Sequence, residues 1–391
     1  MGMKKAPQCL YITADHVGTP TGGGSVTYHE LKALRALGEV QVISRQEMVP
    51  LLEKLPNTPF LQDYVASYLL RDARPNLVHI YGGCFSQTVR LLKERGATVT
   101  YTAAAHDRRL SIEEFARLGL AYPYSHIADE YLWQMYLSGY KMADLVICPS
   151  EQSARLMREY GCVNVKVIPH GCEVPPSSPP SPAPAPPPTP YPDQFTAGYL
   201  GQVGPDKGLV YLLRAWALFP LSREKLLRPG ALFPPPRGKL LIAGPGTETL
   251  GWLVQETGAR NVELLGFIPS VEDFYKRITV YVQPSITESF GLEVLEAMAR
   301  GRPVIVSEGT GARDCIVPGE TGLVVPIRNS SLLAGAITYL YGQPQLVSEM
   351  GRKAVEQARK FTWDKVQASY VKTWKELLGV HIAVQAGTEA H

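Results

Sequence analysis

Two glutamates, Glu288 and Glu296, lie eight residues apart in the segment ESFGLEVLE. The segment follows an apolar, strand-like run and passes through Gly291 into a strongly helical stretch. This pattern predicts that Glu288 precedes a helix and that Glu296 lies about one turn inside it. Carboxylates placed on either side of a helix start can accept hydrogen bonds from neutral hydroxyls, such as those of sugars. The spacing also fits the solvent-exposed face of an amphipathic helix.

The backbone at the start of this helix is a candidate anion site. The first N–H groups of a helix have no partner within the helix, and they attract negative charge. Here these groups belong to Phe290, Gly291, Leu292 and Glu293. We therefore expect a phosphate group to bind between the two glutamates.

A glycine loop that contains a lysine, GQVGPDKG at residues 201–208, follows another strand-like run and leads into a helical stretch. Lys207 would supply a positive charge for a phosphate at this place. The loop is equally compatible with a surface turn.

Two further features near the start of the chain are candidates. Gly22, Gly23 and Gly24 are expected to form a loop before the first helix, where the backbone approaches a phosphate or a sugar or makes a tight turn. A dinucleotide fingerprint is not complete, because position 27 is threonine. His106 follows a strand-like run and would face a crevice at the strand's carboxyl end, unless it is a structural histidine.

Short β-prone runs alternate with helical stretches along the whole chain. The runs lie at residues 10–13, 40–43, 77–80, 98–101, 145–148 and 165–168, and at 197–200, 240–243, 262–265, 280–283, 303–306 and 323–325. The final stretches, 331–341, 344–360 and 363–378, have helical patterns. This alternation predicts an α/β protein with two doubly wound, Rossmann-like domains whose strand ends face a shared cleft.

The domain boundary is marked by composition, since ten of the sixteen residues at 175–190 are proline. Proline fixes φ and has no N–H, so we expect an extended spacer here. A ligand for a proline-binding module is the alternative. The expected organisation is an N-terminal domain at 1–172, a linker at 173–193 and a C-terminal domain at 194–362.

Composition excludes several classes of protein. The chain has 391 residues, of which 45% are hydrophobic and 19% charged, with a formal net charge of +3. A disordered chain and a strongly basic nucleic-acid binder are therefore not expected. Asp-x-Asp, P-loop and Gly-x-Ser-x-Gly motifs are absent from the sequence. The six cysteines have no zinc-type spacing, so we expect reduced thiols in a cytoplasmic protein, with a Cys162–Cys172 disulfide left open.

Taken in order, the motifs resemble the retaining glycosyltransferases of the GT-B architecture, specifically glycosyltransferase family 4. The resemblance rests on the glycines at 22–24, His106, PSE at 149–151, IPHG at 168–171, KG at 207–208, GFIP at 266–269, the segment 288–296, GTGARD at 309–314 and PGETGLV at 318–324. The stretch that begins at Trp363 is similar to the family's last helix, which crosses back to the N-terminal domain. The N-terminal domain would then be the acceptor side and the C-terminal domain the donor side.

The resemblance implies a role for each candidate residue. Glu288 would hold hydroxyls of the donor sugar, Glu296 the ribose, and Lys207 the diphosphate, while His106 would lie beside the donor sugar. The candidate catalytic residues are thus His106, Lys207 and Glu288. The candidate donor-binding residues are Gly23, Gly24, Gln202, Lys207, Phe267, Ile268, Glu288, Phe290, Gly291, Leu292 and Glu296.

Two features depart from the family. Gln202 stands where the family usually has an arginine, so one positive charge for the diphosphate is missing. Lys207 or Arg313 would have to compensate, or the activity is low. The proline-rich stretch is also longer than the family's usual linker, which would change how the domains close.

The implied reaction moves a sugar from a UDP- or GDP-sugar to an acceptor hydroxyl with retention of configuration and without a metal or another cofactor. The departing phosphate oxygen would take the acceptor's proton, which explains why no pair of hydrolase-type carboxylates is apparent. A phosphorylase, an epimerase or a weakened nucleotide-sugar-binding protein remain alternatives.

The acceptor is expected to be a small molecule, a glycan or a lipid-linked sugar, with membrane contact at most peripheral. The aromatic residues at 122–126 and 131–136 would line its site or pack in the core. Arg108 and Arg109 would meet an anionic group of the acceptor or face solvent. We expect no nucleic-acid partner.

Overall fold

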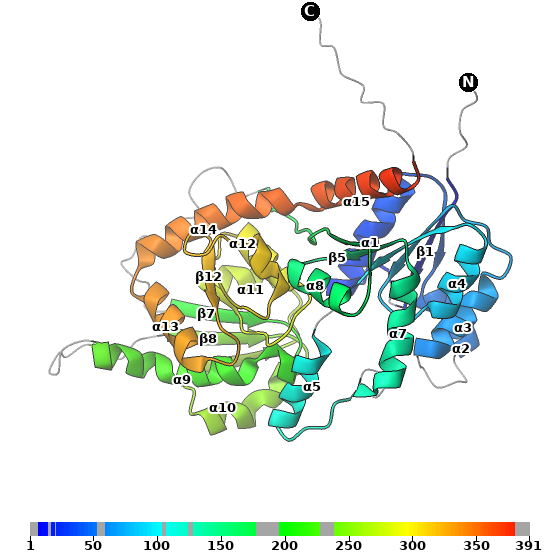
Figure 1. Cartoon of the computed structure of the whole chain (residues 1–391). Helices are drawn as coiled ribbons and strands as arrows, with labels where there is room; N and C mark the ends of the chain where they lie inside the picture. Colours follow the sequence, from blue (N-terminus) through cyan, green and yellow to red (C-terminus); the bar gives the residue numbers. More distant parts are fainter. Residues whose placement is uncertain are drawn as a thin grey trace, which may run out of the picture.

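The computed structural model describes residues 7–14, 17–19, 21–52, 59–103, 107–123, 128–176, 195–226 and 238–379. It contains two six-stranded parallel sheets, each flanked by helices (Figure 1). The strand orders are β2-β1-β3-β4-β5-β6 and β12-β11-β10-β7-β8-β9. The expected α/β class with two doubly wound sheets is therefore confirmed.

The first sheet lies in the N-terminal half of the chain. Its strands are β1 (Cys9–Thr13), β2 (Val40–Ile43), β3 (Leu77–Tyr81), β4 (Thr98–Thr102), β5 (Leu145–Cys148) and β6 (Val165–Val167). The helices are α1 (Gly22–Arg35), α2 (Arg45–Leu52), α3 (Pro59–Leu69), α4 (Ser86–Glu94), α5 (Arg108–Arg117), α7 (Glu130–Met142) and α8 (Glu151–Glu159). The strands β1, β3 and β5 are buried along their whole length, as expected for parallel strands covered on both faces.

The second sheet follows the proline-rich stretch. Its strands are β7 (Phe195–Leu200), β8 (Gly238–Ala243), β9 (Val262–Gly266), β10 (Val280–Gln283), β11 (Val304–Ser307) and β12 (Gly322–Val325). The helical elements are η1 (Pro205–Lys207), α9 (Leu209–Leu226), η2 (Thr247–Leu250), α10 (Gly251–Thr257), α11 (Val271–Arg277), α12 (Leu292–Ala299), η3 (Gly311–Cys315), α13 (Ser330–Tyr341), α14 (Pro344–Ala358), η4 (Arg359–Phe361) and α15 (Trp363–Leu377). Every β-prone run named above is a strand, with ends that differ by at most two residues.

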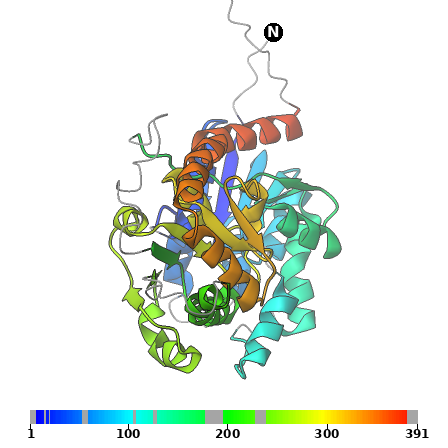
Figure 2. The ribbon, with the colours of Figure 1, turned by 90° about the vertical axis from the view of Figure 1, so that its left-hand side faces the viewer.

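The last helix, α15, returns to the N-terminal half and packs against α1 (Figures 1 and 2). Polar contacts in a buried layer fix it there. The Tyr370 hydroxyl donates to the Glu30 carboxylate at 3.0 Å, and the Trp374 indole donates to Thr100 at 3.1 Å. Glu30 in turn contacts the buried His79 ring at 3.3 Å. The C-terminal helix is thus part of the N-terminal core.

The glycines at 22–24 do not form the expected loop, because α1 begins at Gly22. Thr21 caps the helix by accepting a hydrogen bond from the Gly24 N–H at 3.0 Å. A Cβ on Gly24 would lie 2.2 Å from the Thr19 hydroxyl, so only glycine lets the preceding turn fold onto the helix. The prediction of a loop was wrong since the capping threonine lies earlier than the spacing of apolar residues suggested.

Two other expectations concern the linker and the thiols. Most of the expected linker, residues 177–193, lies outside the described residues. All six cysteines are buried and free, so Cys162 and Cys172 form no disulfide.

Candidate functional site

The loop that carries Glu288 joins β10 to α12 and is fixed by the neighbouring loop after β11. The Glu288 N–H donates to the Gly309 carbonyl at 2.8 Å, and the Gly311 N–H donates to the Glu288 carbonyl at 3.0 Å. This pairing places Glu288 beyond the carboxyl ends of two adjacent parallel strands, where ligands bind in such sheets.

Helix α12 begins directly after this loop, as the sequence predicted. Gly291 is its N-cap residue and has a φ of +92°, a conformation that favours glycine. As a glycine, Gly291 has no side chain with which to cap the helix. Its first-turn amides therefore keep the character of an anion site that the sequence indicated. Glu296 is the fifth residue of the helix, about one turn inside it.

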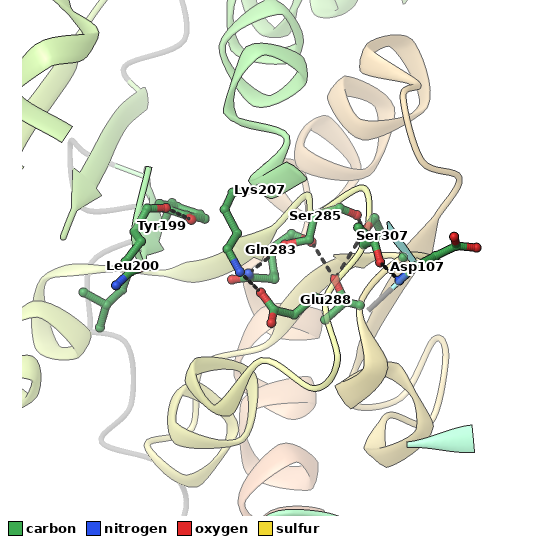
Figure 3. Close-up of polar contacts among 12 residues, drawn as sticks. Asp107, Tyr199, Leu200, Lys207, Gln283, Ser285, Glu288 and Ser307 are labelled. Carbon is green, nitrogen blue, oxygen red and sulfur yellow. Dashed lines mark hydrogen bonds and ion pairs between the residues drawn. The ribbon is translucent and has the colours of Figure 1, made fainter. Parts of the chain in front are cut away.

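Lys207 lies at the end of η1, and its ammonium group forms an ion pair with the Glu288 carboxylate (Figure 3). The two side chains are 23% and 16% exposed. Burial opposes the charge on the lysine, but Glu288 and Asp206 outweigh it and raise the pKa of Lys207. Gly208 allows the end of η1 to lie close to the loop after β10, since a Cβ on this residue would lie 2.1 Å from the Pro284 carbonyl oxygen. The structure therefore brings the predicted cation and the first predicted carboxylate together.

A third carboxyl group, that of Glu293 in the first turn of α12, was not among the candidate side chains. Burial, followed by the charges of Glu288 and Glu296, raises the pKa of Glu293 to about 7. Burial also raises the pKa of Glu296, which accepts a hydrogen bond from the Tyr275 hydroxyl at 3.1 Å. The signal in the sequence was the three-residue spacing from Glu293 to Glu296, which places them on one helix face.

Buried polar contacts connect the strand ends that carry Lys207 and Glu288 (Figure 3). The Tyr281 hydroxyl lies 2.5 Å from the Gln283 amide oxygen and 3.0 Å from the Leu200 carbonyl oxygen. The Gln283 amide donates to the Ser285 hydroxyl at 2.9 Å. These contacts link the ends of β7 and β10. The loop after β7 that carries Lys207 (the lysine loop) and the loop after β10 that carries Glu288 (the glutamate loop) are therefore held next to each other.

The N-terminal half contacts the same loop from the other side. The Asp107 N–H donates to the Thr287 hydroxyl at 2.8 Å, and the Ser150 hydroxyl donates to the Ser289 carbonyl at 2.8 Å. A Cβ on Gly22 would lie 3.5 Å from a methyl group of Leu292, so the starts of α1 and α12 face each other. The Glu288 loop therefore lies at the junction of the two halves.

The remaining predicted residues are more dispersed. His106 lies outside the described residues, although its neighbour Asp107 makes the contact with Thr287. Phe267 follows β9 and is 72% exposed, whereas Ile268 is partly buried. Gln202 is exposed, and its carbonyl accepts from the Tyr199 hydroxyl at 2.9 Å.

Two other basic or aromatic residues lie close to the loop. Arg313, named above as a compensating cation, donates to the Glu308 carbonyl and lies 3.9 Å from Asp314. Phe290 is buried and packs edge-on against the ring of His170. Burial lowers the pKa of His170 to about 4, and its Nδ1 has no hydrogen-bond partner among the residues that the structure describes.

The stretch proposed to contact an acceptor has a mixed character. In α7, Trp133 is buried in the core and Tyr131 is 72% exposed. Part of the other aromatic stretch, residues 124–126, lies outside the described residues. The Arg108 guanidinium stacks over Trp133 at 5.2 Å and pairs with Glu130 at 2.6 Å. Arg108 is therefore partly buried rather than a freely solvated charge.

Within the described ranges, no three His, Cys, Asp or Glu side chains are grouped so that they could hold a metal ion. In that same part of the chain, no helix combines the length and the apolar character that a membrane span needs.

Two family models match the chain. The one described as glycosyl transferases group 1 matches residues 186–361, and the one described as glycosyltransferase family 4 matches residues 16–174. Among similar proteins, a D-inositol 3-phosphate glycosyltransferase from Streptomyces bingchenggensis is 36% identical over 106 residues, which is 27% of this chain and 23% of the relative. The mannosyltransferase LpcC of lipopolysaccharide core biosynthesis, from Rhizobium leguminosarum bv. viciae, is 35% identical over 29% of this chain and 33% of its own. The chain thus aligns with about a quarter to a third of these relatives' length.

Solved structures match over nearly the whole chain. A sucrose-phosphate synthase from Thermosynechococcus elongatus has a TM-score of 0.68 at 19% identity, covering 96% of this chain and 100% of that one. HepE from Anabaena, solved in complex with UDP, has a TM-score of 0.68 at 18% identity, covering 94% and 100%. These likenesses show the fold, and it is the two-domain fold that the family resemblance implied.

Proposed function

Because the chain belongs to glycosyltransferase family 4, we propose that it transfers a sugar from a UDP- or GDP-sugar to a hydroxyl group of an acceptor. The observation that carries this proposal is the ion pair of Lys207 and Glu288 at the open start of α12. It combines a cation and amide groups for a diphosphate with a carboxylate for sugar hydroxyls.

Donor binding would exchange partners at this pair. The diphosphate takes Lys207 as its counter-ion, and the Glu288 carboxylate is then free to accept hydrogen bonds from the donor sugar. Preorganised charges of this kind stabilise the diphosphate as it leaves, and this stabilisation usually contributes most to the rate of such reactions. Glu296 would accept from ribose hydroxyls and the exposed Phe267 would lie near the base.

The transfer step that we propose retains the anomeric configuration and uses no metal. The bond between the anomeric carbon and the phosphate oxygen breaks, the acceptor oxygen bonds to the same face, and the acceptor proton passes to the departing phosphate oxygen. By the family resemblance, His106, which precedes Asp107 in the sequence, would lie beside the donor sugar. Closure of the two halves would limit hydrolysis of the donor.

Similar proteins support a particular nucleotide in the donor and a particular kind of acceptor. Support for a uridine nucleotide comes from solved structures of HepE with UDP and with UDP-glucose. Support for a hydroxyl-rich acceptor comes from relatives named for inositol phosphate and for lipopolysaccharide core. We propose that the acceptor is a small molecule, a glycan or a lipid-linked sugar and that it binds to the N-terminal half. We also propose that the protein is cytoplasmic, with at most peripheral membrane contact.

A panel of nucleoside diphosphates and nucleotide sugars tests the proposal by thermal shift. A ligand at about a hundred times its dissociation constant adds about 2.7 kcal/mol of stability. The donor so identified is then incubated with candidate acceptors, with and without a chelator, and the anomeric configuration of the product is read by NMR. Transfer with retention that the chelator does not affect is expected, whereas inversion or a metal requirement would contradict the mechanism.

A second candidate is a nucleotide-sugar-binding protein with weakened catalysis. The exposed Gln202 favours it, because this position lacks the charge that the family usually supplies. Binding of a nucleotide sugar without turnover across the acceptor panel would identify it. Dependence on free orthophosphate would instead identify a phosphorylase, and product formation without an acceptor an epimerase.

A further inference from the structure

Helix α5 of the N-terminal half packs against η1, the turn that ends in Lys207. One end of α5 touches the glutamate loop, since its N-cap residue Asp107 donates to Thr287. Its other end carries Glu114, which reaches two residues of the C-terminal half. A single short helix therefore contacts both loops of the proposed donor site.

Glu114 is buried completely and is satisfied by residues from across the junction. Its Oε1 accepts from the Tyr211 hydroxyl at 2.8 Å, and its Oε2 accepts from the Arg328 Nε at 2.6 Å. Tyr211 is in the first turn of α9, four residues after Lys207. A buried carboxylate that loses its partners is costly, so these contacts favour the arrangement of the halves seen here.

Arg328 is held in a conformation that a non-glycine residue rarely adopts. Its φ is +58°, which costs about 1–2 kcal/mol for a residue with a side chain. Such a conformation persists where the surroundings fix it, and here the surroundings include Glu114 and, at 3.3 Å, Glu113. Burial opposes the charge on the guanidinium, but Glu114 outweighs it and raises the pKa of Arg328.

We propose that Glu114 is a positioning residue of the transfer reaction: through Tyr211 and Arg328 it fixes α5 against the lysine turn. This inference rests on the proposed function. Donor and acceptor groups would come from opposite halves of the protein, and the segment with His106 immediately precedes α5. Glu114 thereby sets the separation between α5, whose N-cap residue Asp107 contacts Thr287, and the Lys207–Glu288 pair, and small errors in such a separation are costly to the rate.

The first test measures the separation of the halves directly, without a substrate. Spin labels are placed at Glu94→Cys in α4 and Leu332→Cys in α13, which are both exposed, while the native cysteines are all buried. We expect one distance in the parent protein and an added, longer population in Glu114→Gln, which keeps an acceptor for Tyr211 but loses the charge facing Arg328. Arg328→Asn should do the same, since asparagine tolerates the left-handed backbone.

Arg117→Gln is the matched control, because Arg117 lies on the same helix, is exposed and pairs with Glu113 within that helix. It should leave the distance unchanged. If Glu114→Gln does not fold, Tyr211→Phe removes one of the two contacts and should give the longer population in its place. A distance distribution in Glu114→Gln that matches the parent protein would overturn the proposal.

The second test separates positioning from binding. Glu114→Gln should lower kcat at least about tenfold while the KM for the nucleotide sugar changes less than about threefold. Adding Arg328→Asn should cost little more, since both changes remove one interaction. Additive losses, or an unchanged kcat, would contradict the role. If the proposed function itself is wrong, the parent protein will transfer no sugar from any nucleotide sugar of the panel, yet the distances will still report on Glu114.

Discussion

The ammonium of Lys207 and the carboxylate of Glu288 are ion-paired although 81 positions separate them in the chain. One follows β7 and the other follows β10, two strands that are neighbours in the second sheet. Parallel pairing therefore brings the lysine loop and the glutamate loop to the same edge. The pair combines a cation that a diphosphate would bind with a carboxylate that sugar hydroxyls would contact. From these two roles we predict how a substitution of each residue affects catalysis.

Lys207→Ala and Glu288→Gln should each lower kcat/KM for the nucleotide sugar at least about tenfold. Lys207→Ala removes the counter-charge for the diphosphate, so it should also weaken binding of the free nucleoside diphosphate. Glu288→Gln should leave that binding intact or improve it, because Lys207 no longer has a competing carboxylate. Steady-state kinetics and calorimetry measure both effects.

The matched control for the lysine is Lys239→Ala, which breaks a surface ion pair with Glu263 in the same half of the protein. It should leave both measurements near the parent values. Near-full transfer activity in either site variant would remove the assigned roles.

Much of this arrangement was predictable from local patterns. Strand runs, the start of α12 and the places of Glu288 and Glu296 follow from hydrophobic periodicity and from one glycine, since these signals act within a few residues. The start of α1 was misplaced because a capping threonine decided it. The raised pKa of Glu293 was not predicted, because it depends on burial of the side chain.

The contacts of Glu114 had no local signal at all. Its partner Arg328 is 214 positions away, and nothing in either neighbourhood indicates that they meet. Such pairs form only when two folded domains pack against each other. The periodicity and spacing of residues in the sequence do not indicate how the domains pack. Local patterns determine the strands and helices, so the fold was predicted and is confirmed. The roles of the site residues depend on contacts between distant segments, and these roles stay predictions.

Gly291→Ala should destabilise the protein and lower donor affinity. The residue has a φ of +92°, and a Cβ would lie 3.3 Å from a methyl group of Thr310. The strain should cost about 1–2 kcal/mol of the free energy of unfolding. It would also shift the first amides of α12. Thermal unfolding and nucleotide binding measure these two effects.

Gly335→Ala serves as the comparison, because Gly335 lies inside α13, where an added Cβ would meet no described atom within 4 Å apart from its chain neighbours and its own helix backbone. Alanine in a helix should raise stability by about 0.5–1 kcal/mol. If both alanine variants behave alike, the strain at Gly291 is not what fixes the helix start.

Glu293 predicts how stability depends on pH. Its pKa is raised from 4.5 to about 7, so the folded protein binds a proton more tightly than the unfolded chain. The stabilising contribution of the protonated group is complete below the unfolded pKa and is lost as the pH rises through about 7. Glu293→Gln should therefore remove this loss and raise Tm more at about pH 8 than at about pH 5.

Glu263→Gln is the control for that pH series, since surface lysine and arginine groups hold the pKa of Glu263 below its ordinary value. It should not improve stability at high pH. An equal Tm change for Glu293→Gln at both pH values would show that this carboxyl group titrates normally.

Gln202→Arg should strengthen binding of nucleoside diphosphates. Gln202 is exposed and lies in the same loop as Lys207, where the family resemblance implies an arginine. A guanidinium forms paired hydrogen bonds to phosphate oxygens, so we expect affinity to rise about tenfold and the gain to shrink at high salt. Gln202→Leu has no charge and should bind no more tightly than the parent protein. If the arginine variant binds as the parent does, another residue already supplies the second positive charge, and the departure at this position no longer favours weakened catalysis.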